Sequence, residues 1–253
     1  MEPEPPDTQA TPVWDPSGVA GYMAVSLTKT ARECGWPDDL RGNAAKLLIQ
    51  DLGEFGQAMV ACGRANFWSP AKALERMFIE RVEVLMGASV DASIAKRYLD
   101  TIVKTAGTEA PLKPATRARS EDAFDVYVRA VGLSGDEREE FRRQWLALKN
   151  ISSDWFVHPT AMGPLLSAQV QINADEAAAN WGLLIQLLAS GCVWAIAVAN
   201  PLKVTLHPEI VRSLDGAAKC LQELGSKNWR GVSELHSLIA ERTLVKDPNA
   251  AAE

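Results

Sequence analysis

The chain has 253 residues, of which 47% are hydrophobic and 23% charged, a composition typical of globular proteins. This length allows one large domain or two small ones, with a core that needs no disulfides. The formal net charge of −6 argues against a broad nucleic-acid-binding surface, which is usually basic.

The amino-terminal segment 1–16 is acidic and rich in proline, which predicts a disordered tail. It has neither the basic start nor the apolar core of a secretory signal, so we expect a cytoplasmic protein. The four cysteines are scattered and form no C-x-x-C pair, which indicates reduced, buried thiols instead of disulfides or metal ligands.

After this tail, apolar residues recur with a helical period between capping signals. A first helix is followed by a second, which Pro37 opens. Ser69 as N-cap and Pro70 at the first helical position open a third, which ends at Gly87. A fourth helix follows, and Gly107 is its natural stop.

The second half of the chain carries similar signals. Ser134 and Glu137 have capping-box spacing before an amphipathic helix, and Asn173 and Glu176 repeat that spacing before an apolar one. His207, which a proline follows, opens a further helix. We therefore predict an all-α bundle of about nine helices. The predicted parts are a single helical domain over 17–245, an irregular segment near 153–172, a last helix over 231–243 and a frayed tail over 246–253.

The stretch from Trp181 to Ala199 is long and apolar enough to span a membrane, with Gln186 and Ser190 as its only overtly polar side chains. However, Trp194 lies in the middle, whereas tryptophan in membrane helices prefers the interface. The other predicted helices are amphipathic and need a partner that covers their apolar faces. We therefore expect a central helix buried in the bundle, and no membrane partner.

The segment ALERMFIERVEVL, residues 73–85, places Arg76 and Glu80 one helical turn apart on a shared face. Arg81 falls in the middle of the apolar face, where a charge needs a partner, and Glu83 lies opposite. One hypothesis is that Arg81, or the Arg76–Glu80 pair, faces a polar cleft and binds there. The alternative is a structural ion pair. The predicted apolar face consists of Leu74, Met77, Phe78, Val82 and Leu85.

A second candidate is the segment NISSDWFVHP, residues 150–159. If the preceding helix continues into it, Ser152 and Trp155 lie on the inward, apolar side. Proline pushes the residue before it out of the α region, so His158 marks the helix end, with its ring free to turn toward the bundle. His158 then acts either as an acid/base or ligand group in a cleft, or as a helix-end residue that bonds carbonyl groups.

A third candidate is RGVSELH, in which five residues separate Arg230 from His236. This spacing is similar to the R-x(4–6)-H pattern of HEPN-type helical ribonucleases, where arginine and histidine serve the scissile phosphate and proton transfer. The position after the arginine, usually polar in that pattern, is Gly231 here. The histidines have no metal-ligand spacing, and no phosphate loop or dinucleotide fingerprint occurs, so we expect no metal or cofactor.

Two of these segments together resemble an uncharacterised bacterial all-helical family. ALERMFIERVEVLMGASVDASIAKRYL resembles the R-x-x-x-E helix of that family, and ISSDWFVHPTA resembles its Ser…Val-His-Pro-Ser/Thr segment. The resemblance covers roughly residues 45–165 and implies an all-helical fold in which the arginine–glutamate pair meets the histidine in space. It implies no established reaction. The matching positions are Arg76, Glu80, Ser153 or Ser152, His158 and Thr160.

Two hypotheses of function follow. The first, which the acidic composition favours, is a non-enzymatic helical binding or assembly protein whose cluster of Arg76, Glu80 and His158 locks the bundle. The alternative is a HEPN-like, metal-independent ribonuclease or toxin-type protein of phage defence, with RNA as its partner. In that case His158 is the acid/base and arginine binds phosphate. A homo-oligomer is compatible with both hypotheses.

Overall fold

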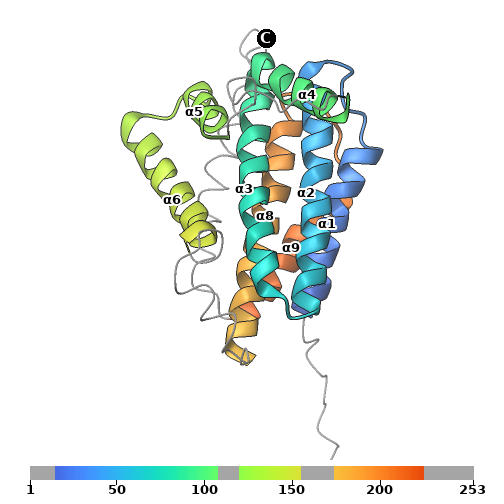
Figure 1. Cartoon of the computed structure of the whole chain (residues 1–253), viewed down its shortest axis with the longest axis vertical. Helices are drawn as coiled ribbons and strands as arrows, with labels where there is room; N and C mark the ends of the chain where they lie inside the picture. The colour runs from blue at the N-terminus through green and yellow to red at the C-terminus, as the bar shows by residue number, and fades with distance from the viewer. Residues whose placement is uncertain (1–14, 108–119, 155–173, 225–253) are drawn as a thin grey trace, which may run out of the picture.

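The computed structural model describes residues 15–107, 120–154 and 174–224, which form eight α-helices (Figure 1). No strand occurs in these ranges, so the predicted all-α fold is confirmed. The predicted helix over 231–243 and all but the start of the irregular segment lie outside the described residues. The helices are α1 (Pro16–Glu33), α2 (Leu40–Arg64), α3 (Trp68–Val90), α4 (Ala92–Gly107), α5 (Ser120–Ala130), α6 (Gly135–Asp154), α8 (Ala174–Ala199) and α9 (Pro208–Glu223).

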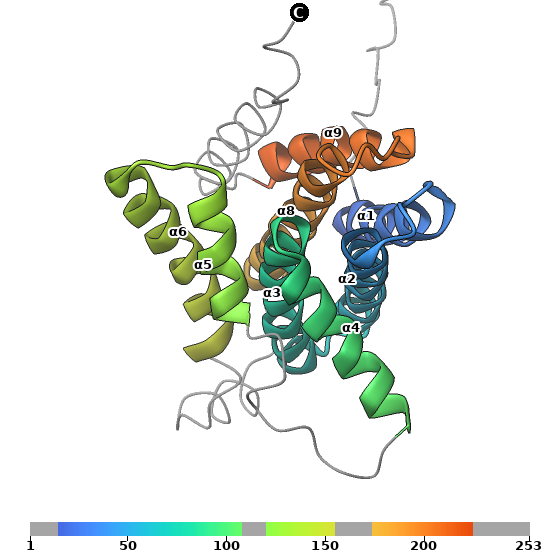
Figure 2. The same cartoon turned by 90° about the horizontal axis from the view of Figure 1, so that it is seen from above.

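Four helices, α1, α2, α3 and α8, run along the long axis of the molecule (Figure 1). Seen from above, α5 and α6 lie beyond α3 on one side, and α9 lies against α1 and α8 on another (Figure 2). The short α4 packs on one end of α2 and α3. As a result, α3 has neighbours on several sides, namely α2, α5, α6 and α8.

The centre of the core is α8. Trp194 is fully buried, and its indole packs edge-on against Tyr127 of α5 and Trp145 of α6, with ring centroids 5.3 and 6.3 Å apart. The segment Ala177–Ala199 is long and apolar enough to cross a membrane, with a hydropathy of 2.0, but 83% of its most apolar window is buried inside the bundle. The structure therefore buries this helix among the amphipathic ones, as predicted.

Two predicted helix starts are confirmed. The Ser134 N–H donates to Glu137 Oε2 over 2.9 Å, and the Glu137 N–H donates to Ser134 Oγ over 3.4 Å, which forms the capping box of α6. At the start of α9, His207 is the N-cap, and its Nδ1 accepts the Glu209 N–H over 3.4 Å. Pro208 occupies the first turn of α9, where its missing N–H is not needed.

The predicted start of α2 at Pro37 is wrong. The N-cap is Asp39, whose carboxylate accepts the Gly42 N–H over 2.7 Å. Pro37 instead lies against the side of the first turn, since a Cβ added at Gly42 would sit 2.2 Å from the Pro37 carbonyl oxygen. The absence of a side chain at Gly42 therefore lets the connecting loop fold back onto the helix.

Both predicted ends of α3 are wrong as well. The helix starts at Trp68, so Ser69 and Pro70 lie inside its first turn instead of marking its cap. At the other end, α3 continues past Gly87. A Cβ at Gly87 would lie 2.6 Å from the Cβ of Ala123, so this glycine allows close approach of α5 and does not stop the helix.

Candidate functional site

The predicted ion pair on α3 is present. Arg76 Nε donates to Glu80 Oε1 over 2.8 Å. The two side chains are 22% and 43% exposed, so the pair reaches the surface of the bundle. The i, i+4 spacing in the sequence therefore predicted this contact correctly.

A second ion pair on α3 is buried and joins Lys72 to Glu75. Lys72 Nζ lies 3.0 and 3.1 Å from the two carboxylate oxygens of Glu75, and the side chains are 4% and 1% exposed. Removing two charges from water is costly, and the attraction between Lys72 and Glu75 offsets part of that cost. Neither residue is among the predicted site residues, although their i, i+3 spacing on a helix is a signal that could have found them.

Glu83 lies opposite the predicted apolar face of α3, but that side of the helix is also buried. The carboxylate of Glu83 accepts a hydrogen bond from Trp145 Nε1 of α6 over 2.9 Å, and Glu83 is 2% exposed. Conversely, Met77 of the predicted apolar face is 44% exposed. The helical wheel fails here because α5 and α6 cover a side of α3 that the wheel assigns to solvent.

Lys72, Arg76 and Glu83 lie along one stripe of α3, because residues one and two helical turns apart share a face. The contact between Glu83 and Trp145 places α6 against this stripe. Since α6 runs antiparallel to α3, its last turn lies toward the amino-terminal half of α3 (Figure 1). The polar stripe and the end of α6 are therefore on the same side of α3.

The structure gives only a partial test of the segment NISSDWFVHP. The backbone of Ser152 and Ser153 belongs to the last turn of α6, so the helix does continue into this segment and ends at Asp154. The approach of His158 to the Arg76–Glu80 pair stays a prediction. The predicted site residues that lie outside the described ranges are Trp155, His158, Thr160, Arg230 and His236.

Arg81, a predicted binding residue, faces α2 and α4 and forms a separate cluster. Its Nε lies 3.2 Å from Asp51 Oδ2, which also accepts the Tyr98 hydroxyl over 3.0 Å. The guanidinium carbon lies 5.9 Å from the centre of the Tyr98 ring. Burial raises the pKa of Asp51 above its ordinary value even though the Arg81 charge opposes that change. This arrangement favours the alternative of a structural ion pair.

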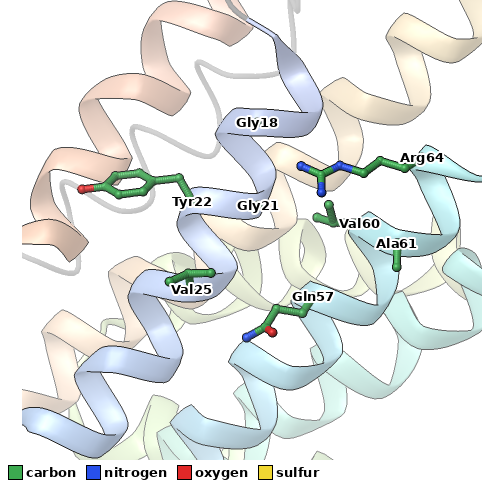
Figure 3. A pocket seen from close by; sticks show the side chains of 8 residues that line it. All are labelled: Gly18, Gly21, Tyr22, Val25, Gln57, Val60, Ala61 and Arg64. Atoms are coloured by element: carbon green, nitrogen blue, oxygen red, sulfur yellow. The ribbon is translucent and has the colours of Figure 1, made fainter.

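A shallow groove of about 460 Å³ lies between α1 and α2 (Figure 3). Arg64 and Gln57 reach from α2 toward α1, whereas Tyr22 points away from α2. Arg64 is held there because its Nη2 donates to the Ser17 carbonyl over 3.2 Å. Tyr22 and Val25 are each 40% exposed, so large apolar side chains border this groove and contact solvent.

A second groove, of about 570 Å³, lies on the opposite side of Tyr22, between α1 and α9. Tyr22 lines both grooves and therefore forms a ridge between them. The charged residues around the second groove are Asp15, Arg212, Asp215 and Lys219. Sequence patterns did not predict either groove, because each needs the packing of helices that are distant along the chain.

The described ranges contain no group of three or more His, Cys, Asp or Glu side chains that could hold a metal ion. Cys34, Cys62, Cys192 and Cys220 are free thiols. Burial raises the pKa of Cys192 to about 12, so this thiol stays protonated near neutral pH and is a poor nucleophile.

No protein-family model, curated protein or solved structure matches this chain. The resemblance to a bacterial all-helical family and the HEPN-type spacing therefore depend only on the residues quoted for them.

Proposed function

We propose that this protein is a non-enzymatic helical assembly protein that pairs with a second copy of itself through the outward face of α1. The observation that carries this proposal is the Tyr22 ridge. Tyr22 and Val25 stay 40% exposed, although a helix normally turns its large apolar side chains inward. Val211 on the neighbouring α9 is 52% exposed. Large apolar side chains that stay exposed on neighbouring helices support an interaction site here.

The shape of this face suits a second copy. Helices pack by inserting the ridge of one into the groove of the other. The outward face of α1 offers both, because the Tyr22 ridge has a groove on each side. In a two-fold dimer the same surface is used twice, so the ridge of one copy can enter a groove of its partner.

The charges around the grooves also fit self-association. A two-fold interface needs cations and anions on the same surface, since each residue meets a different residue of the identical partner. Both signs are present here. The cations are Arg64, Arg212 and Lys219, and the anions are Asp15 and Asp215.

In this proposal the polar stripe of α3 locks the bundle. Two residues of this stripe, Lys72 and Glu83, are almost fully buried, as is Glu75, the ion-pair partner of Lys72, so these three are not accessible to a substrate from solvent. The bond between Glu83 and Trp145 joins α3 to α6. This role supports the assembly hypothesis over the ribonuclease alternative.

The test is the mass of the protein in solution, measured by sedimentation velocity over a concentration series. We expect wild type to be a dimer and Val25→Asp to be a monomer, because a carboxylate in the interface would be desolvated without a partner. The matched control is Ile102→Asp on α4, since Ile102 is 39% exposed and α4 packs on α2 and α3 instead of α1. This control should remain dimeric, and all three proteins should melt at similar temperatures.

A monomeric wild type at all concentrations, or a Val25→Asp variant that stays dimeric, would contradict the proposal. The same protein preparations should be incubated with RNA. Cleavage of RNA by wild type that is lost in His158→Ala, with unchanged melting, would support the ribonuclease alternative instead.

A further inference from the structure

A small pocket with three arginines lies between α5 and α6, on the side of the molecule away from α1 (Figure 2). Its volume is about 230 Å³. Three guanidinium groups and a single carboxylate leave a local charge of about +2, in a chain whose overall charge is −6. The lining residues are Phe124, Asp125, Val128, Arg129, Arg138 and Arg142.

The three arginines differ in how they are bonded. Arg142 Nη2 donates to Asp125 Oδ1 over 2.6 Å, which neutralises the one carboxylate among the described lining residues. Arg129 Nε donates to the backbone carbonyl of Asp125 over 3.1 Å. Arg138 Nε is buried and has no hydrogen-bond partner among the described residues. A buried donor without a partner is unfavourable, and an anion that enters the pocket would provide its acceptor.

The pocket has rigid walls. Phe124 of α5 stacks on Phe141 and Trp145 of α6, with ring centroids 5.3 and 6.0 Å apart. Arg138 and Arg142 lie one turn apart on α6 and so share its inner face. The aromatic stack therefore holds α5 against α6, and the bonds to Asp125 hold the Arg142 and Arg129 side chains in position before any ligand arrives, which reduces the entropy lost on binding.

We propose that this pocket binds the phosphate group of a small phosphorylated molecule. A guanidinium presents its donors in a planar fork that matches the oxygens of phosphate. The small volume suits one phosphate group. The acidic net charge argues against an extended polyanion, because nucleic-acid surfaces carry basic residues over a much larger area. The proposal does not depend on self-association, since the pocket and the outward face of α1 share no residue.

The experiment titrates the full chain with inorganic phosphate at low ionic strength and measures the heat of binding. Arg138→Gln and Arg129→Gln alter the pocket from two different helices, and each should weaken binding by about tenfold or more, the usual effect of losing a hydrogen bond to a charged group. The matched control is Arg143→Gln. Arg143 neighbours the pocket residues on α6 but pairs with Glu140 on the exposed side, so this variant has the same charge change.

Phosphate binding that both pocket variants weaken and Arg143→Gln preserves supports the proposal, with unchanged helical content and melting as the check on folding. Absence of phosphate binding by wild type overturns it, and so does an equal loss in all three variants. A short single-stranded RNA is titrated in parallel. RNA binding without phosphate binding also overturns the proposal, because the ligand would then be a polymer.

Discussion

The buried pair Lys72–Glu75 differs in kind from the exposed ion pairs of this protein. Lys96 and Asp100, one turn apart on α4, are 62% and 42% exposed and lie 2.9 Å apart. At such a site water and salt screen the charges, and the pair adds little stability. The Lys72 and Glu75 side chains are 4% and 1% exposed, so substituting Lys72 removes an ion-pair partner of Glu75 at a site where water has little access to replace it.

We therefore expect Lys72→Met to lower the free energy of unfolding by about 3–5 kcal/mol, measured by urea denaturation. The control substitution Lys96→Met removes an exposed pair and should change it by less than about 1 kcal/mol. The double variant Lys72→Met/Glu75→Leu removes both charges and should regain most of the loss. A Lys72→Met variant as stable as wild type would show that the pair is not important for folding.

At the scale of helices, Gly87 makes a close contact between α3 and α5. Because Gly87 has no side chain, the backbone of α3 can approach Ala123 closely. This contact holds α5, and with it the α5–α6 hairpin, against the polar stripe of α3. A glycine inside a helix has low helix propensity, so Gly87 makes α3 itself less stable. The tertiary contact with α5 that it allows offsets this loss.

Gly87→Ala should lower the free energy of unfolding by about 1–3 kcal/mol, because its Cβ would overlap Ala123 and separate the two helices. Gly182→Ala on α8 is the matched control. The nearest atoms to a Cβ there are 3.9 and 4.0 Å away, so the methyl group fits, and we expect a gain of up to about 1 kcal/mol from helix propensity. Thermal melting of both variants gives the comparison, and equal effects would contradict it.

A structural feature can be predicted from the sequence when the residues that produce it are close together along the chain. The capping box of Ser134 and Glu137 and the pair of Arg76 and Glu80 are local, and spacing alone predicts them. The burial of Glu83 depends on α6, which is distant along the chain. A glycine such as Gly87 is typical of a helix end, but here it makes a packing contact inside α3. Only the position of α5 shows which of these two roles Gly87 has.

For the whole molecule, the central question is the environment of α8. By length and composition this helix could cross a membrane, but in the bundle its window is 83% buried. We expect the full chain, expressed without detergent, to remain in the supernatant after high-speed centrifugation, because its apolar surface is already covered. Recovery only in the membrane pellet, with release by detergent, would contradict this expectation.

The position of α8 also affects how the chain can fold during synthesis. The ribosome releases α1, α2 and α3 before Ala174, where α8 begins. Until then Leu27 and Phe78, which approach Gly191 of α8 in the finished protein, lack the helix that covers them. Nascent chains with uncovered apolar surface aggregate readily. We therefore expect the growing polypeptide to need protection from aggregation until α8 has been made.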